Sequence, residues 1–462
     1  MVATMTSQTA SLSDYTLFAR HVLLPDGWHQ DQRISIAGGK ISHITTSSPE
    51  PSDRVIDVLL PGMPDLHSHA FQRGMAGLAE VKGPGADSFW TWRQVMYRFL
   101  EKLTPDDLTA IATLAYIEML ESGFTRVGEF HYLHHAPDGK PYSQPAAMSD
   151  AIIDAAISTG INLTMLPVFY AHSGFGGQAP EAAQQRFIHS TDDFGKLYEH
   201  IERRLLTTDG AVTGVAPHSL RAVTGEELQF LTSLGNGPVH IHIAEQMKEV
   251  NSCLAHYGAR PVQWLLDNQP VNARWCLVHA THLDEAEISA LARSKAVAGL
   301  CPVTEANLGD GLFPLTPFLE AGGRIGVGSD SNVKIDAPEE LRLLEYGQRL
   351  QLQNRNVSQR HAGERCGQSL WQQSVAGGAQ ALGTAPGLQP GACADMVSLK
   401  ISGLPDMLRS HDNIIEQLVF CHNKDLIDSV WVNGRLTVKE GRHAGREHAQ
   451  RAFIKTINRV FQ

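Results

Sequence analysis

The sequence predicts an α/β protein whose centre is a (β/α)8 TIM-like barrel, flanked by a small β-sandwich domain formed by both chain ends. Two observations predict the barrel. Eight short apolar runs follow one another along the chain, and segments with helical periodicity separate them. The runs show little alternation of apolar and polar residues, as in parallel strands that are buried on both faces. The third observation, β-type runs with glycine turns at both ends of the chain, predicts the sandwich.

The eight predicted strands occupy residues 58–69, 124–130, 162–170, 212–219, 237–245, 274–282, 296–303 and 324–331. Strands that alternate with helices in this way are typical of a parallel barrel. In such a barrel, the side chains that carry chemistry lie at the carboxyl ends of the strands. The ends of these eight runs are therefore the first places to look for a site.

Capping residues mark the ends of several predicted helices. The helix over residues 104–123 begins with an N-cap threonine that is followed by proline, and it stops at a glycine. Ser149 and Gly160 bound a second helix in the corresponding way. Thr224 and Glu227 have the spacing of a capping box, which predicts that a third helix begins there.

The chain divides into three predicted parts. Residues 1–60 supply the amino-terminal part of the β-sandwich, residues 61–385 the (β/α)8 barrel, and residues 386–462 the carboxy-terminal part of the sandwich with a tail. Gly-Gly at 38–39 and Asn-Gly at 433–434 are typical of hairpin turns. Both hairpins fall in the two end segments, as the sandwich requires.

Composition and charge exclude several classes of partner. Of the 462 residues, 42% are hydrophobic and 19% charged, as in an ordinary globular protein. The formal net charge of −11 argues against nucleic acid and anionic membranes as partners. The six cysteines contain no CxxC pair, and no secretory signal or membrane-spanning run is recognisable. We therefore expect a cytoplasmic protein without a nucleic-acid or membrane partner.

Histidine and acidic residues gather at the carboxyl ends of four predicted strands. They are His67 and His69 on the first strand, His242 and Glu245 on the fifth, His279 on the sixth and Asp330 on the eighth. Each residue alone has a plainer explanation, such as a core histidine or a turn aspartate. Their common position at one end of one barrel favours a shared site instead.

A bound divalent metal explains this set. Two histidines one residue apart on a strand point to the same side, so His67 and His69 can reach one ion. A third imidazole from His242 and the carboxylate of Asp330 complete a nitrogen and oxygen ligand set that suits zinc, although iron and cobalt also suit it. A metal in an open site lowers the pKa of a bound water, and Glu245 is then placed to shuttle a proton.

Several motifs resemble a known family. The HxH at the first strand, His242 with Glu245, His279 and the GSD that ends at Asp330 resemble the amidohydrolase superfamily. Binuclear members carry a carboxylated lysine at the fourth strand, where this chain reads VAPHSLRA, so the resemblance implies one metal. The segments PDLHSHAFQRGMAGLAE, FWTWRQVMYRF, VGEFHYLHH, APHSLRAV and CPVTEANLGDGLFP are similar to those of the formimidoylglutamate deiminase family.

The resemblance assigns roles to matching positions. It implies one divalent metal, Zn²⁺ or alternatively Fe²⁺, held by His67, His69, His242 and Asp330. It implies that the catalytic residues, which transfer protons and polarise the reacting group, are Glu245, His279 and Asp330. It implies substrate binding by Gln72, Arg93, Tyr132, His218 and Arg221.

The reaction implied by the resemblance is hydrolysis of N-formimino-L-glutamate to N-formyl-L-glutamate and ammonia, in histidine degradation. This substrate is a small anionic dicarboxylate, and guanidinium groups make forked hydrogen bonds to carboxylates. Arg221 follows the fourth predicted strand, and Arg93 lies in the predicted loop after the first. The two arginines therefore suit the two carboxylates of the substrate.

Some alternatives stay open at this stage. The chain could be a deaminase of guanine, a pterin or an adenosine derivative, or a metal-binding barrel without catalysis. The sequence does not choose between the glutamate and aspartate derivatives, nor decide whether the glycine-rich loop 173–187 is a lid or a plain surface loop. By resemblance we expect a homodimer. His131, His134 and His135 are interpreted as structural or surface residues.

Overall fold

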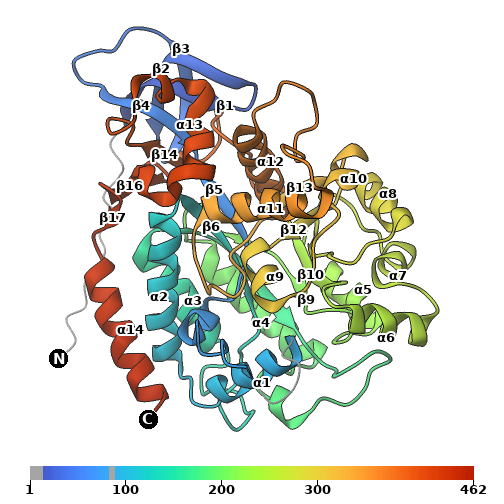
Figure 1. Ribbon diagram of the computed structural model, residues 1–462. Helices are drawn as coiled ribbons and strands as arrows, with labels where there is room; N and C mark the ends of the chain where they lie inside the picture. The colour runs from blue at the N-terminus through green and yellow to red at the C-terminus, as the bar shows by residue number, and fades with distance from the viewer. Residues whose placement is uncertain (1–13, 83–88) are drawn as a thin grey trace, which may run out of the picture.

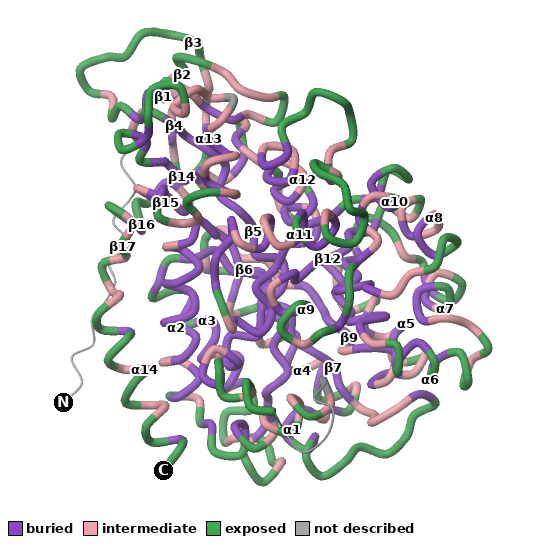
Figure 2. The backbone as a smooth tube through the Cα atoms, viewed as in Figure 1, coloured by how far each residue is buried: buried purple, intermediate pink, exposed green. Residues whose placement is uncertain are grey.

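The structure is a computed structural model, and it describes residues 14–82 and 89–462. Figure 1 shows a β-sheet region built by both chain ends at the top of the view and, below it, a larger body in which strands alternate with helices. Figure 2 shows that the buried backbone is concentrated along the strands in the middle of this body, while most loops are exposed. The described residues include no helix with both the length and the apolar composition needed to cross a bilayer.

Parallel strands form the centre of the larger body. In chain order they are β5 (Met63–Ser68), β6 (Phe124–His131), β7 (Asn162–Phe169), β8 (Val212–Thr213), β9 (Ala216–Pro217), β10 (Val239–Ile243), β11 (Trp275–His279), β12 (Val297–Leu300) and β13 (Arg324–Val327). They form two sheets, β5-β6-β7-β8, with β9 also paired to β7, and β10-β11-β12-β13. Isolated parallel bridges join Ser68 to Asp330 at one seam and Val215 to Val239 at the other. Backbone pairing therefore continues from β13 to β5 and from the β9 region to β10.

Two predicted strands differ in the structure. The apolar run 58–69 is divided, because β4 (Arg54–Pro61) belongs to the sheet of the chain ends and β5 begins only after Gly62. A Cβ atom at Gly62 would lie 2.3 Å from the side chain of Thr125, so the chain needs glycine where it passes between the two parts. The predicted strand 212–219 is broken into β8 and β9, since the backbone changes its hydrogen-bonding partner between them, from Met165 to Pro238.

Helices follow most of these strands and lie outside them (Figure 1). The α-helices are α1 (Phe89–Leu100), α2 (Pro105–Glu121), α3 (Ala147–Thr159), α4 (Thr191–Leu205), α5 (Gly225–Ser233), α6 (Met247–Tyr257), α7 (Pro261–Asn268), α8 (Glu285–Ser294), α9 (Pro302–Leu308), α10 (Leu315–Glu320), α11 (Ala337–Leu352), α12 (Cys366–Ala381), α13 (His411–Gln417) and α14 (Arg446–Val460). Shorter turns are η1 (Ala70–Met75), η2 (Ala182–Gln184), η3 (Asp406–Leu408), η4 (Leu418–His422) and η5 (Asn423–Leu426).

The capping residues mostly act as predicted. The Thr104 side chain accepts a hydrogen bond from the third residue of α2, and Thr224 does the same for α5, each within a complete capping box. Gly160 ends α3 with a left-handed φ of 78°. The prediction that Ser149 is the N-cap of α3 is wrong, because the helix begins at Ala147 and Ser149 lies buried inside it. Burial of this first turn sets the start of the helix, which has no side-chain cap.

Both chain ends contribute strands to one sheet. It has the order β17-β16-β15-β14-β4-β1-β2-β3, in which the strands not yet given are β1 (Tyr15–Leu24), β2 (Gly27–Ala37), β3 (Lys40–Thr46), β14 (Met396–Leu399), β15 (Ile427–Val432), β16 (Arg435–Lys439) and β17 (Arg442–His443). The antiparallel pair β4-β14 joins the two ends. The predicted hairpins at 38–39 and 433–434 are present, with positive φ at all four residues. The Ile41 amide donates to the Ala392 carbonyl, so this sheet curls back on itself.

The six cysteines are free thiols, four of them buried, as predicted for a chain without disulfides.

The histidines near the end of β6 are structural residues, and the alternative that they lie on the surface is wrong. His131, His134 and His135 are all buried. The rings of His134 and His135 lie 4.5 and 4.6 Å from the ring of His189, measured between centroids. His131, His134, His135 and His189 thus form a cluster of four buried imidazoles.

We expect acid to destabilise the protein as the pH falls from 6.5 towards 4, with a contribution from His189. Burial lowers the pKa of His189 to about 4, whereas an unfolded chain binds that proton near pH 6.5. The unfolded state therefore takes up more protons in this window, and the free energy of unfolding decreases. Urea unfolding at pH 7 and pH 5 should show a smaller decrease for His189→Gln than for the wild type. The exposed His43→Gln variant is the control and should match the wild type; equal decreases in all three proteins would remove His189 as a contributor.

Candidate metal centre and active-site pocket

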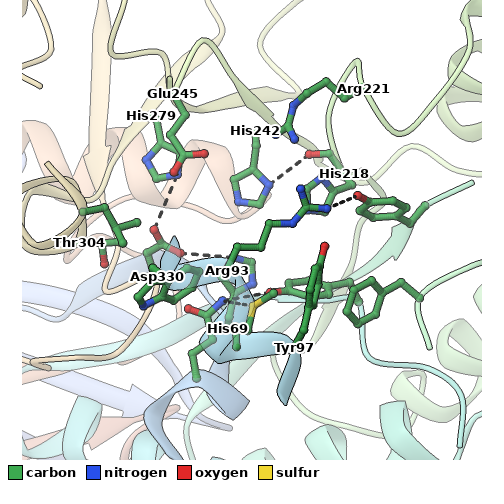
Figure 3. Close-up of a pocket in the computed structure, with 17 residues that line it drawn as sticks. His69, Arg93, Tyr97, His218, Arg221, His242, Glu245, His279, Thr304 and Asp330 are labelled. Atoms are coloured by element: carbon green, nitrogen blue, oxygen red, sulfur yellow. Dashed lines mark hydrogen bonds and ion pairs between the residues drawn. The ribbon is translucent and has the colours of Figure 1, made fainter. Parts of the chain in front are cut away.

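A pocket opens at the carboxyl ends of the parallel strands, and residues from strand ends, helices and a loop line it (Figure 3). Every residue that the sequence proposed for metal, catalysis or substrate lines this pocket except His67, which lies directly beneath His69. The structure thus brings the whole proposed set together.

The inner end of the pocket contains four converging ligand atoms. Nε2 of His67 lies 3.2 Å from Nε2 of His69 and 3.0 Å from Nε2 of His242. Oδ1 of Asp330 lies 3.3 Å from Nε2 of His69 and 3.6 Å from Nε2 of His67. All four side chains are buried, and their ligand atoms lie within 4.8 Å of one another. This group could hold one metal ion.

Hydrogen bonds on the far side of two rings show why the group fits a cation. Nδ1 of His69 donates to the carbonyl of Phe130 at 2.9 Å, and Nδ1 of His242 donates to the carbonyl of His218 at 3.1 Å. Burial lowers the pKa of His69 to about 3 and that of His242 well below its usual range, so both rings are neutral. Their Nε2 atoms then present lone pairs. Lone pairs that face one another repel unless a cation lies between them, so this donor set fits a divalent metal.

The segment that carries Asp330 is fixed by its backbone. Asp330 does not end the eighth strand as predicted, because β13 stops at Val327 and Asp330 follows in a left-handed conformation with φ 47°. Its amide donates to the carbonyl of His67, and its carbonyl accepts from the amide of His69, both at 2.9 Å. The Asn332 side chain donates to the carbonyls of His69 and Asp330 at 3.1 Å. Two ligand-bearing segments are therefore tied to each other.

Glu245, His279 and Asp330 meet on the other side of the pocket floor (Figure 3). Nε2 of His279 lies 3.9 Å from Oε1 of Glu245 and 3.7 Å from Oδ2 of Asp330. Burial by itself would lower the pKa of His279, but the carboxylates of Glu245, Glu305 and Asp330 outweigh it and raise the pKa to about 10. His279 can therefore donate a hydrogen bond from Nε2 into the pocket.

Two arginines line the outer part of the pocket. Arg93 does not lie in an irregular loop as predicted, because the segment after β5 contains α1 and Arg93 is on that helix. Its guanidinium donates to the Tyr170 hydroxyl at 3.4 Å. Arg221 follows β9, and within the described residues its buried Nε has no hydrogen-bond partner. Burial first, and then the charges of Arg221 and Arg93, lower the pKa of His218, so both cations lie close to that ring.

Gln72 and Tyr132 form a neutral polar wall. The side-chain amide of Gln72, on η1, donates to the Tyr132 hydroxyl at 3.0 Å, and both residues are buried. Oε1 of Gln72 is buried, and among the described residues it has no hydrogen-bond partner. The ring of Tyr132 lies 5.0 Å from that of His69, between centroids. The wall therefore stands directly beside the metal ligands.

The sequence analysis missed further lining residues: Trp92, Met96, Tyr97, Tyr170, Phe187, Thr304 and Leu308. Tyr170 directly follows β7, so the rule that strand ends carry function could have found it. Tyr97 lies on α1 and Thr304 on α9. The rule that functional residues lie at strand ends does not predict that these helices cover the pocket. Phe187 belongs to the glycine-rich loop 173–187, and Gln184 of the same loop donates to the Tyr170 hydroxyl at 2.8 Å. This end of the loop is thus part of the pocket wall.

Comparison with known proteins agrees with this site. The family model described as "Amidohydrolase family" matches residues 58–437, so the protein is a hydrolase of the metal-dependent amidohydrolase class. A second model, "Formimidoylglutamate deiminase HutF, N-terminal domain", matches residues 15–56. The formimidoylglutamate deiminase of Pseudomonas aeruginosa is 48% identical over 96% of this chain and 99% of its own length. The chain belongs to the amidohydrolase family, in its formimidoylglutamate deiminase branch.

Two solved structures resemble this one. An amidohydrolase from Brucella melitensis has a TM-score of 0.94 and 51% identity, and the match covers 97% of this chain and 100% of that one. An adenosine deaminase from Xanthomonas campestris, solved with bound zinc, has a TM-score of 0.82 and 21% identity, over 97% of this chain and 98% of that one. At 21% identity, the second likeness concerns the fold alone.

We expect one equivalent of a divalent metal per chain, and we expect His242→Asn to lose it. His240 offers a matched control, because it lies on the same strand, is equally buried, and bonds through Nε2 to the Ala381 carbonyl instead. His240→Asn should therefore keep its metal. Elemental analysis of the purified proteins measures this. A full equivalent of metal in His242→Asn, with correct folding by circular dichroism, would contradict the ligand set.

Proposed function

We propose that this protein hydrolyses N-formimino-L-glutamate to N-formyl-L-glutamate and ammonia, as a step of histidine degradation. One observation carries the proposal. A four-ligand metal site, a proton-transfer pair and two arginines share one pocket, in a chain that is 48% identical to a formimidoylglutamate deiminase. We propose zinc as the metal, because three imidazoles and one carboxylate form a nitrogen and oxygen ligand set that suits zinc.

The proposal includes the architecture around the pocket. We propose a closed (β/α)8 barrel over residues 61–385, flanked by a β-sandwich from residues 1–60 and 386–462. The bridges at both seams support closure, and the curled sheet of the chain ends supports the sandwich. We propose a cytoplasmic location, which free cysteines support, and a homodimer, since two-fold dimers are the commonest assembly.

The ligand residues prepare the reacting water. His67, His69, His242 and Asp330 would hold the metal. When bound, a divalent cation lowers the pKa of a coordinated water and polarises the group that it attacks. The second carboxylate oxygen of Asp330, which faces His279, accepts a hydrogen bond from the attacking water and orients it.

Glu245 and His279 manage the protons of the reaction. The water oxygen bonds to the formimino carbon, and Glu245 accepts the proton that the water releases. Glu245 then delivers this proton to the terminal nitrogen, and the second proton of the former water passes to the same nitrogen. The bond between the carbon and that nitrogen then breaks, ammonia leaves, and the oxygen remains as the formyl carbonyl. Nε2 of His279 donates a hydrogen bond that stabilises charge at the reacting centre.

The outer pocket recognises the rest of the substrate. Arg93 and Arg221 are suited to its two carboxylates, since each guanidinium presents paired donors. They supply local positive charge in a protein whose formal net charge is −11. Gln72, Tyr132 and His218 lie between these cations and the metal ligands, where they can hydrogen-bond the formimino-amide portion.

A second candidate is a deaminase of guanine, a pterin or an adenosine derivative. The aromatic residues that line the pocket, including Tyr97, Tyr170 and Phe187, favour it because they could stack on a flat base. The two arginines favour the dicarboxylate instead. A metal-binding protein without catalysis is disfavoured, because metal ligands and proton-transfer groups are all present together.

Ammonia release by the zinc-loaded protein tests the proposed substrate. We compare N-formimino-L-glutamate, N-formimino-L-aspartate, guanine and adenosine under the same conditions. We expect the glutamate derivative to be fastest and to exceed the aspartate derivative by about 10-fold or more in kcat/KM, because one methylene in a fitted pocket is worth about 1–3 kcal/mol. Faster turnover of guanine or adenosine would instead favour the purine deaminase.

Replacing Glu245 tests the proposed proton transfer. We expect Glu245→Gln to retain its metal while kcat falls by about 10²–10⁴-fold, since the amide cannot move a proton. Glu249 is the matched control, because it is equally buried, lies four residues further on, and does not line the pocket. Glu249→Gln should stay within a few-fold of wild-type kcat. Near-normal kcat in Glu245→Gln would remove its role.

A further inference from the structure

A buried carboxylate contacts the proposed catalytic histidine from the side away from the pocket. Oε1 of Glu305, on α9, lies 3.2 Å from Nδ1 of His279. Glu305 is only 5% exposed and does not line the pocket, so it cannot touch the substrate. Its Oε1 also accepts the backbone N–H of Cys301 at 2.9 Å. Because this oxygen accepts from the backbone at the same time, the group shared with Nδ1 is an N–H that the histidine donates.

The contact decides which ring atoms of His279 face the pocket. His279 ends β11 in a left-handed conformation, with φ 67°, which fixes the direction of its Cβ but not the rotation of its ring. A half-turn of the ring would place carbon atoms where the nitrogens now lie. With Nδ1 held by Glu305, Nε2 stands 3.9 Å from Oε1 of Glu245 and 3.7 Å from Oδ2 of Asp330.

We propose that Glu305 is a positioning residue for His279, which holds Nδ1–H so that Nε2–H is aimed at the reacting group. The inference rests on the proposed function, because that function gives His279 its task. Glu305 acts through His279 and has no contact with substrate. A carboxylate that fixes the ring and proton position of an imidazole is a general device in acid and base catalysis.

A second metal ion is the competing explanation for this cluster. His279, Cys301 and Glu305 present ligand atoms within 4.8 Å of one another. The Cys301 thiol, however, is fully buried among apolar residues that include Leu66 and Val278. Nδ1 of His279 and Oε1 of Glu305 already share a hydrogen bond, so two of the three possible ligand atoms are occupied. The hydrogen bonds to Oε1 of Glu305 also leave this oxygen already satisfied.

Glu305 also stabilises its own helix, so the variants must separate the two roles. Its carboxylate reaches back to the amide of Cys301, the residue before α9. Glu305→Gln keeps an oxygen that can accept from both Cys301 and His279, whereas Glu305→Ala removes both bonds. Glu340 is the matched control: it is fully buried on α11, and its carboxylate accepts the backbone N–H of Val303 on the same helix α9 at 2.9 Å.

We expect Glu305→Ala to lower kcat for N-formimino-L-glutamate by about 10–100-fold, while KM changes less than about threefold and the metal is retained. Glu305→Gln should recover a large part of this loss. Glu340→Gln should keep wild-type kcat, although it changes a buried carboxylate against the same helix. Equal losses in the Glu305 and Glu340 variants, or a loss in KM alone, would overturn the proposal and indicate a structural role only.

A second readout does not depend on the substrate. In ¹⁵N-histidine-labelled protein, the Nδ1–H that donates to a carboxylate should give a downfield proton signal, assigned by its loss in His279→Gln. It should be absent in Glu305→Ala, shifted in Glu305→Gln and unchanged in Glu340→Gln. If no variant releases ammonia but this pattern appears, the proposed function fails and the positioning contact stands. If the signal persists in Glu305→Ala, the positioning proposal fails whatever the substrate.

Discussion

Three imidazole Nε2 atoms and one carboxylate oxygen converge at the inner end of the pocket, and the rest of the site is arranged around that constraint. Nε2 of His67 lies within 3.2 Å of the Nε2 atoms of both His69 and His242. The rings of His69 and His242 donate from Nδ1 and therefore turn their Nε2 lone pairs to this point, which suits a cation. The segments at the ends of β5, β10 and β13 bring the four side chains together, and the isolated bridge between Ser68 and Asp330 links two of these segments.

Buried carboxyl groups support this centre from behind. Asp65 accepts the amide of Ser329 at 2.9 Å, which ties β5 to the segment that carries Asp330. Glu129 accepts the amide of Ala70 at 2.8 Å and so fixes the chain directly after His69. Burial raises the pKa of Asp65 to about 7 and that of Glu129 to about 8. Burying these groups costs free energy, which their hydrogen bonds partly offset, and the gain is a fixed position for the metal ligands.

Two kinds of segment line the pocket. The proposed metal ligands, the proposed proton-transfer residues and the proposed substrate contacts Tyr132, His218 and Arg221 lie at or just after strand ends, whereas Gln72, Arg93 and Thr304 come from η1, α1 and α9. These helical segments cover the pocket without taking part in the parallel sheets. A change in them can alter which substrate fits while the metal centre is preserved. The placement of Arg93 and Arg221 near His218 adds positive charge to the outer part of this pocket.

Pattern and chemistry in the sequence alone determined the alternation of strands and helices, the hairpins at both chain ends, and the four candidate ligands. The spacing of apolar residues and the capping residues of helices are local features of the sequence. Strand ends are recognisable because the apolar runs stop there. The division of the run 58–69 could not be seen, since it depends on the approach of Gly62 to Thr125 on another strand. Ser149 has the residue type of an N-cap, but the sequence does not show that its side chain is buried inside α3.

Only the tertiary structure decided which side chains share the pocket with the ligands. Tyr97, Thr304 and Phe187 reach it from helices and a loop that are far apart in the sequence. Glu305 sits 26 residues after His279, and nothing in that spacing predicts a hydrogen bond. Secondary-structure propensity depends on neighbouring residues and can be recognised in the sequence. The composition of the site depends on how strands, helices and loops are oriented relative to one another, and tertiary packing sets those orientations.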